Sequence, residues 1–406
     1  MSVSHVLAPH APLFAGIESA APDALLALIG LHAADPRSGK IDVGVGVYRD
    51  EAGATPVLAA VKAAEHQLLE QQTSKSYLGP EGDVQFTRLL ADILFGTEFA
   101  RAPGLVGLQT PGGTGALRVA AELLAQAGAG RQVWVGLPTW ANHIPLLAAA
   151  GLRVREHRFF DGIRSDLDFD GMIAALSEAQ AGDILLLHGC CHNPTGISFS
   201  HDQWKQLAGL CVSRSLFPLI DIAYQGLGDG LREDAVGMRL FLEHVPEALI
   251  AYSCDKNFGL YRERVGALWA WTRSREVGGR VMSQLCALAR VNWSMPPDHG
   301  AALVRLILSD DALRASWMSE LEAMRQRIAA LRVHLGSSHP KLAPIARQKG
   351  MFAMLPILPD AVAALRQEHA IYMASNGRIN VAGLSESSID RFCDAIRSYL
   401  SDGQSA

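Results

Sequence analysis

A lysine at the end of an apolar run is the first residue in this sequence whose setting suits it for chemistry. Lys256 follows the segment Ala248 to Tyr252, which is typical of a buried strand. A lysine in such a place is a candidate amine nucleophile, because desolvation or a cationic neighbour lowers the pKa of its ammonium group. The alternative is a structural salt bridge to a carboxylate at a domain interface.

Asp221 stands in a similar place, at the end of the apolar run Phe217 to Ile220. Burying its carboxylate without a partner costs several kcal/mol, so we expect the side chain to be paired. A helix cap or an ordinary ion pair would satisfy this requirement without any catalytic role.

A glycine-rich turn follows another apolar run, where residues 108–118 read LQTPGGTGALR. Gly112 and Gly113 allow a ligand to approach the backbone closely, and we expect Thr114 to cap the helix that follows. The free amide groups of that helix would face an anion, for which phosphate is the natural candidate. An ordinary glycine turn with a threonine cap is the alternative. The segment has neither the GKS/T of a P-loop nor a GxGxxG pattern, which argues against ATP and dinucleotides.

Two competing chemistries find less support. Ser253 and Lys256 form an S-x-x-K pattern, but the chain has no SDN or KTG motif and the pattern does not open a helix. His188 to His192 reads HGCCH, yet these metal-ligand types are crowded together, and neither C-x-x-C nor H-E-x-x-H occurs. We therefore predict no metal site.

The elements that must position these residues follow an alternating pattern between about residues 105 and 275. Short apolar runs with strand character alternate with helical patterns, which predicts an α/β fold with a mainly parallel sheet. Such a sheet binds ligands at the carboxyl ends of its strands. The expected strands are Leu105 to Gln109, Val133 to Leu137, Ile184 to Leu187, Pro218 to Ile222, Ala248 to Tyr252 and Val265 to Trp271.

A long amphipathic helix is predicted from Ser309 to Gly336, with Ser309 and Asp310 as candidate caps and Gly336 as its end. We place the change of domain there. The last seventy or so residues predict a smaller α+β unit with short strands near Met351 to Met354 and Arg378 to Val381.

Composition excludes several classes of protein. The 406 residues are 49% hydrophobic and carry a formal net charge of −5, without the basic excess that nucleic-acid binding needs. The longest apolar stretches, such as Ala24 to Leu31, are far shorter than the ~20 residues that cross a bilayer. The first basic residue is Arg37, so we see no targeting segment, and six cysteines at low density suit a reducing cytoplasm.

A phosphate cradle, a buried aspartate and a buried lysine at successive strand ends are what pyridoxal phosphate requires. From about Pro22 onward the chain resembles the class I aminotransferases of the aspartate and aromatic amino-acid type. The motifs that carry the resemblance are IDVGVGVYRD from Ile41, SKSYLG from Ser74, QTPGGTGALR from Gln109, PTWANH from Pro138, HGCCHNPTG from His188, DIAYQG from Asp221, KNFGLYRERVG from Lys256 and GRINVAG from Gly377.

The resemblance implies fold type I, in which a large cofactor-binding domain joins a smaller α+β domain built from both chain ends. We expect the large domain at residues 56–309 and the small one at 1–55 and 310–406, with an arm over about the first 15 residues. The family also implies a homodimer with shared active sites, whose small-molecule partners are an amino acid and a 2-oxo acid.

The resemblance further implies the roles of individual residues. Lys256 would bind pyridoxal 5′-phosphate covalently and then move a proton between the substrate Cα and the cofactor C4′. Asp221 would keep the pyridine nitrogen protonated. Asn193 and Tyr224 would hydrogen-bond the phenolic oxygen, and Trp140 would stack on the ring. The phosphate would be held by Gly112, Gly113, Thr114, Ser253, Arg264 and, from the neighbouring subunit, Tyr77.

Substrate binding follows by the same matching. Arg378 would take the α-carboxylate, with help from the Gly46 backbone, Trp140 and Asn193. Arg290 of the neighbouring subunit would bind the distal carboxylate of aspartate or glutamate. These assignments predict transfer of the amino group from aspartate, aromatic amino acids or both to 2-oxoglutarate in a ping-pong cycle.

Three positions depart from the family pattern. Asp255 replaces a small hydroxyl residue before the lysine, which we expect to raise the pKa of Lys256 or shift the cofactor's spectrum. Cys254 stands where aspartate-specific members often have tyrosine, and Met295 replaces a common asparagine, which favours a roomier pocket.

These departures leave three alternatives beside an enzyme that accepts both donors. The first is an aminotransferase that prefers aromatic amino acids and has little aspartate activity. The second is a lyase or decarboxylase that uses the same cofactor. The third is a non-catalytic sensor of the transcription-regulator kind, which would need a DNA-binding module that the sequence before Gly44 does not indicate.

Overall fold

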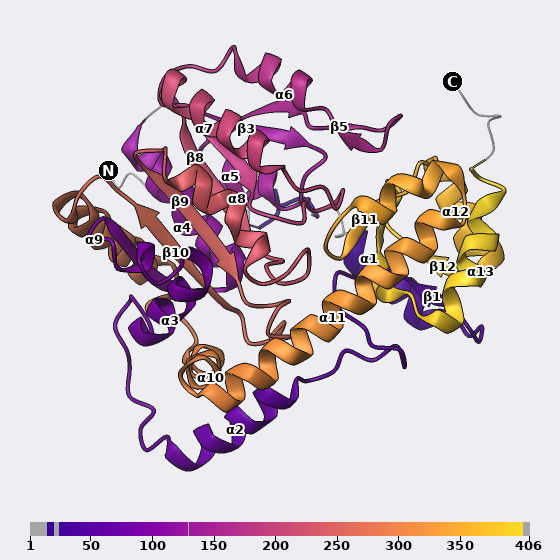
Figure 1. The fold of residues 1–406 in the computed structure, drawn as a ribbon, viewed down its shortest axis with the longest axis horizontal. Coiled ribbons are helices and arrows are strands. Elements are labelled where there is room, and N and C mark those ends of the chain that lie inside the picture. The colour runs from indigo at the N-terminus through magenta and orange to yellow at the C-terminus, as the bar shows by residue number, and fades with distance from the viewer. Residues whose placement is uncertain (1–13, 20–23, 129, 401–406) are drawn as a thin grey trace, which may run out of the picture.

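The computed structural model describes residues 14–19, 24–128 and 130–400 of the chain, so residues 1–13 of the expected arm lie outside the described residues. Within the described part, the centre of the fold is a seven-stranded sheet (Figure 1). Across the sheet its strands are β2 (Leu105–Pro111), β10 (Val265–Trp271), β9 (Ala248–Ser253), β8 (Phe217–Ile222), β7 (Ile184–His188), β3 (Gln132–Leu137) and β4 (Arg153–Arg158).

The sheet is mainly parallel, and the predicted α/β fold class is confirmed. Only β10 among these strands runs antiparallel to both of its neighbours, β2 and β9. All six expected strands are present, each within a residue or two of its predicted bounds. The strand β4 was not predicted, because it lies at the sheet edge and its sequence RVREHR carries the charges that protect an exposed edge.

Helices bury both faces of this sheet. Successive residues of β7 point to opposite faces of the sheet, and both faces are buried: Leu185 and Leu187 belong to one hydrophobic core, while Ile184 and Leu186 belong to another. Short segments around the sheet are η1 (Phe99–Arg101), β5 (Phe160–Asp161) and β6 (Asp166–Leu167). The helices are α2 (Ala59–Gln71), α3 (Val84–Phe95), α4 (Gly112–Ala127), α5 (His143–Ala149), α6 (Phe169–Leu176), α7 (His201–Arg214), α8 (Glu233–Leu242), α9 (Arg275–Trp293) and α10 (Asp298–Ser309).

The predicted long helix is α11 (Asp311–Ser337), which runs from beside α2 and α10 to the C-terminal elements (Figure 1). The Asp310 carboxylate accepts hydrogen bonds from the first amides of the helix, as expected of its cap. Ser309 instead ends α10, and Gly336 lies inside the last turn, where it lets Ala346 pack closely. In the part of the chain that the structure describes, no helix is long and apolar enough to span a membrane.

Elements from both ends of the chain build a further core around the end of α11. The parallel pair of β1 (Ile41–Asp42) with β12 (Ile371–Tyr372) joins the two ends. The expected strands near Met351 and Arg378 are present as an antiparallel pair. The other members are α1 (Ala24–Ala34), η2 (Pro340–Arg347), β11 (Phe352–Met354), α12 (Pro359–His369), β13 (Arg378–Asn380), η3 (Val381–Gly383) and α13 (Glu386–Arg397). The division at residues 55 and 309 stays a prediction.

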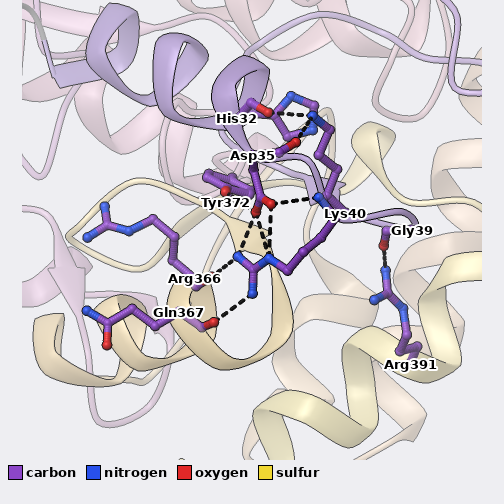
Figure 2. A network of polar contacts seen from close by, with 9 residues as sticks. His32, Asp35, Gly39, Lys40, Arg366, Gln367, Tyr372 and Arg391 are labelled. Atoms are coloured by element: carbon purple, nitrogen blue, oxygen red, sulfur yellow. Dashed lines mark hydrogen bonds and ion pairs between the residues drawn. The ribbon is translucent and has the colours of Figure 1, made fainter.

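Two cations fix the segment between α1 and β1 to these elements (Figure 2). Lys40 donates to the carbonyls of His32 and Asp35 at 2.6 and 2.9 Å, which satisfies acceptors at the end of α1. Arg37 pairs with the Asp35 carboxylate and also donates to carbonyl oxygens near the end of α12. Lys40 brings positive charge to the C-terminal end of α1, and Arg37 brings it to the C-terminal end of α12, where each charge complements the helix dipole. The segment before β1 is therefore held against α12.

Candidate active site

The carboxyl ends of the parallel strands converge on one edge of the sheet, where a cavity of about 150 Å³ opens. Asp221 lies near the end of β8 and Ser253 ends β9. Because β10 runs antiparallel, Arg264 directly before it reaches the same edge. The topology therefore brings together residues that lie up to about 150 positions apart in the sequence, as expected for a sheet of this kind.

One end of the cavity is formed by Gly113, Thr114, Ser253 and Arg264. Gly112 adopts a φ of +68°, and a Cβ atom there would lie 2.5 Å from the Arg264 guanidinium. Only glycine suits this position, since any side chain would displace the arginine. The amides at the start of α4 have no partners within that helix, so this end combines free N–H donors with a cation and suits an anion.

The prediction that Thr114 caps α4 is wrong. The helix begins at Gly112, with Pro111 before it and no side-chain cap, so Thr114 lies in the first turn. The left-handed backbone of Gly112 turns the chain from strand to helix without an intervening residue, so the cap position is Pro111, three positions before Thr114. Thr114 still lines the cavity.

The lining of the cavity also includes Trp140, Asn193, Asp221, Tyr224 and Lys256. The Asp221 carboxylate accepts a hydrogen bond from His143 Nε2 at 3.1 Å, and His143 Nδ1 lies 2.8 Å from the Thr139 hydroxyl. Although burial alone raises the pKa of Asp221, the hydrogen bond to His143 and nearby positive charge bring it below its ordinary value. The side chain is therefore a buried anion, available to a cationic ligand.

Tyr224 and Lys256 lie beside this carboxylate. Asn193 Nδ2 donates to the Tyr224 hydroxyl at 3.2 Å, while the buried Asn193 Oδ1 has no partner within the described residues. Burial raises the pKa of Tyr224, so its hydroxyl keeps its proton. Burial also lowers the pKa of Lys256, against the opposing charges of Asp255 and Asp221. A lower pKa leaves more of this amine neutral and able to act as a nucleophile or base.

Arg378 reaches the same region from β13. Its guanidinium lies 4.8 Å from the centre of the Phe352 ring, which in turn lies 5.7 Å from the Tyr224 ring. Its Nη2 donates to the Gly44 carbonyl at 2.7 Å, but among the described residues its buried Nε has no acceptor. A Cβ atom on Gly46 would lie 2.9 Å from the same Phe352 ring, so Gly46 and Arg378 flank one aromatic side chain.

A family model for aminotransferases of class I and II matches residues 38–396. The chain belongs to this family. It is 52% identical over 376 residues to a tyrosine aminotransferase of Rhizobium meliloti (strain 1021), which covers 92% of this chain and 96% of that protein. It is 45% identical over 400 residues to an aspartate aminotransferase of Escherichia coli (strain K12), at 96% and 100% coverage.

A crystal structure of an aromatic-amino-acid aminotransferase from Burkholderia pseudomallei, covalently bound to pyridoxal phosphate, matches with a TM-score of 0.94. The two chains are 38% identical, and the match covers 96% of this chain and 100% of that one. This chain is accordingly a pyridoxal phosphate-dependent aminotransferase, which confirms the family resemblance, the cofactor and the enzyme class predicted from the sequence. A non-catalytic sensor is thereby set aside.

The cavity of this aminotransferase fits its cofactor chemically. A buried carboxylate held below its ordinary pKa suits a pyridinium nitrogen, and the unpartnered Asn193 Oδ1 is a buried acceptor that lacks a donor. The glycine turn beside Arg264 suits a phosphate. The roles of the single residues stay predictions.

Five predicted site residues are not among the described residues that line the cavity: Gly46, Gly112 and Arg378, which lie close to lining residues, and Tyr77 and Arg290. Tyr77 is 91% exposed, and Arg290 is exposed on α9, where it donates to the Ser294 hydroxyl at 2.7 Å. Neither side chain is among those that line the cavity in the described part of this aminotransferase.

The three residues that depart from the family pattern occupy different positions relative to the cavity. Asp255 forms an ion pair with Arg264, and its charge raises the pKa of Lys256 as expected, although burial outweighs this effect and leaves the pKa of the lysine below its ordinary value. Cys254 is fully buried in the core of the sheet. Met295 does not line the cavity within the described residues, so the roomier pocket expected from it stays a prediction.

Sequence reasoning missed three residues that support the site. His143 ends the PTWANH motif, so its place in a matching motif was the available signal, but its contact with Asp221 depends on the folding of two distant strands. Phe352 packs between Tyr224 and Arg378. Asn380 donates from Nδ2 to the carbonyls of Val45 and Val47 at 2.7 Å and so shapes the loop around Gly46.

Proposed function

We propose that this aminotransferase moves the amino group of aspartate and of aromatic L-amino acids to 2-oxoglutarate in a ping-pong cycle. The observation that carries the proposal is that a buried anion and a lysine of lowered pKa line one cavity, while an arginine with a free donor lies close to Tyr224 of the same cavity. The names of the relatives, which include tyrosine, aromatic and aspartate aminotransferases, support these donors.

The cofactor would lie along the cavity between two groups of residues. We assign its phosphate to Gly112, Gly113, Thr114, Ser253 and Arg264, where free amides and a cation meet. The remaining contacts would come from Asp221 at the pyridine nitrogen, Asn193 and Tyr224 at the phenolic oxygen, and Trp140 against the ring face. When bound, pyridoxal phosphate supplies an electron sink for the electron pair left at the substrate Cα.

The residues of this chain would do the rest of the chemistry. Asp221, kept anionic by His143, would hold a proton on the pyridine nitrogen. Lys256 would take the proton from the substrate Cα and return it at C4′, which requires a neutral amine and agrees with the direction of its pKa shift. Tyr224 would donate its retained proton in a hydrogen bond.

Substrate recognition would depend on two arginines. We assign the α-carboxylate to Arg378, whose Nε has a free N–H, together with the Gly46 backbone, Trp140 and Asn193. We further propose a homodimer, in which Tyr77 and Arg290 of one copy complete the cavity of the other. Their exposure at positions that match functional residues of the family supports this arrangement. A dimer would also place Arg290 to bind the distal carboxylate of aspartate.

We also propose the domain division 56–309 against 1–55 with 310–406. The separate hydrophobic cores of the sheet and of the C-terminal elements support it, because Leu331 and Leu335 of α11 pack with the second core while Trp317 and Leu321 pack with the first. The cavity would lie in the larger unit, and Arg378 would reach it from the smaller one.

The test is an absorption spectrum of the purified enzyme after addition of aspartate or, separately, phenylalanine, each without an oxo acid. We expect each donor to convert the band of the enzyme-bound cofactor to that of its amine form in a single turnover. The variant Lys256→Ala is the control and should bind the cofactor without converting it.

A lyase or decarboxylase is the competing function, and the same experiment separates it. Such an enzyme would consume the amino acid catalytically without an oxo acid and leave the cofactor band unconverted. Asp255, which suggested this alternative, pairs with Arg264 at the proposed phosphate end. Conversion by phenylalanine alone would instead favour an aromatic-preferring enzyme with little aspartate activity.

A further inference from the structure

Asp255 brings a second negative charge to the end of the cavity that we assign to the cofactor phosphate. Its carboxylate is buried and lines the cavity. One oxygen, Oδ2, lies 2.5 Å from Arg264 Nη1, whereas the other, Oδ1, is buried without a partner among the described residues. A buried carboxylate oxygen without a donor is costly, so this oxygen is available to whatever hydrogen-bond donor enters.

The ion pair with Asp255 occupies Arg264, the cation that we assign to the cofactor phosphate. Arg264 also donates to the Tyr261 carbonyl, and its guanidinium lies directly against Gly112. The other titratable groups around Asp255 are Lys256, which would carry the cofactor, and Cys254 and Tyr261, whose raised pKa values keep them neutral. The charges of Asp255 and Arg264 therefore cancel before any phosphate binds.

A phosphate dianion entering this end would meet a neutral ion pair in place of a free cation. Two anionic oxygens at hydrogen-bond distance in a buried site are stable only when they share a proton, as with paired carboxylates. The second pKa of a phosphate monoester is about 6, so at neutral and higher pH this proton must come from solvent.

We propose that Asp255 makes binding of the cofactor phosphate depend on uptake of one proton, which the carboxyl group holds and donates to a phosphate oxygen. Protonation of the Asp255 carboxylate breaks its ion pair with Arg264. Both terminal nitrogens of Arg264 can then donate hydrogen bonds to the phosphate. The inference rests on the phosphate site of the proposed function. Its consequence is a cofactor affinity that falls as pH rises.

The experiment measures binding of pyridoxamine 5′-phosphate to the full-length apoenzyme between pH 6.5 and 8.5. This probe carries the phosphate but no aldehyde, so it forms no bond with Lys256. One linked proton changes affinity by about tenfold per pH unit, so the wild-type affinity should fall about 100-fold more over this range than that of Asp255→Asn. Asparagine keeps the shape and can donate from its amide without taking up a proton. Asp255→Ser is the second variant, in case asparagine impairs folding.

Infrared difference spectra of the wild type, taken before and after the probe binds, give a readout that needs no variant. We expect the carboxylic acid C=O band of a protonated Asp255 to appear on binding. Equal pH dependence in the wild type and both variants, or absence of that band, would overturn the inference.

A third variant separates this inference from the phosphate site itself. Arg264→Gln should weaken binding of the probe at every pH. If Arg264→Gln binds as tightly as the wild type, the assignment of the phosphate site is wrong. If it binds more weakly while the pH dependence is the same with and without Asp255, only the proton-linked role is wrong.

Discussion

Replacing Arg378 by alanine should lower kcat/KM for every amino-acid substrate, because all of them carry the α-carboxylate. Among the described residues, Nη2 of this guanidinium gives one N–H to the Gly44 carbonyl and the buried Nε has no acceptor, which leaves N–H groups of the planar fork, Nε–H among them, for a bidentate contact. A hydrogen bond to a charged group contributes about 1.5–3 kcal/mol, so two contribute about 3–6 kcal/mol. At about 1.4 kcal/mol per factor of ten, kcat/KM should fall by roughly 10² to 10⁴.

The assay is the rate at which aspartate and phenylalanine convert the cofactor band in single turnovers of the loaded enzyme. Arg378→Lys is the matched variant, since it keeps the charge but loses the planar fork, and its kcat/KM should lie between those of alanine and the wild type. Arg290→Ala should spare phenylalanine and harm aspartate. The reasoning would be refuted if Arg378→Ala lost less than tenfold, or if it lost activity with aspartate alone.

Three further substitutions probe the supporting structure. His143→Asn removes the hydrogen bond to Asp221 and should lower the single-turnover rate about tenfold, as loss of about 1.4 kcal/mol implies; an unchanged rate would show that Asp221 needs no support. Arg332→Met leaves the carbonyls of Lys349, Gly350 and Phe352 without their buried donor and should cost about 3–5 kcal/mol in urea unfolding, whereas a loss below 1 kcal/mol would contradict the importance of this network. Burial lowers the pKa of His188 to about 3, while an unfolded histidine titrates near 6.5. The unfolded chain therefore binds the extra proton in this window, and stability should fall on acidification from pH 6.5 by up to about 1.4 kcal/mol per unit, less steeply in His188→Gln.

The central strands were predictable because burial on both faces makes each of them a continuous apolar run. The strand β10 was predicted from Val265 to Trp271 and has those bounds. The strand β4 lies at the edge of the sheet and pairs with only one of the described strands. It carries charged residues in place of an apolar run, so its sequence shows no strand pattern. Glycine is typical of a helix end, but Gly336 lies inside the helix because the absence of a side chain lets Ala346 pack against it.

The candidate site was predictable only as far as single residues and their motifs go. Asp221 lies near the end of β8 and Lys256 follows β9, and the ends of these parallel strands meet at one edge of the sheet. The pairing of these side chains was not predictable, because the partners lie on other segments whose positions depend on the whole fold. The contact between Asp221 and His143 joins residues 78 positions apart, and the pairing of Asp255 with Arg264 crosses a turn.

The pairing of β1 with β12 has a consequence for the order in which the protein is made. Ile41 lies beside Ile371, and Arg37 and Gln367, which hydrogen-bond in the same layer, are 330 residues apart. At synthesis rates of about 5–20 residues per second, the first strand leaves the ribosome roughly 20 to 60 s before its partner. Once β10 has been made, the sheet around β8 can form, while the N-terminal segment still has no surface to join. A nascent chain that ends between Trp271 and Ile371 therefore exposes Ile41 and Val43 to chaperones, although β8, which bears Asp221, and β9, which precedes Lys256, are already complete.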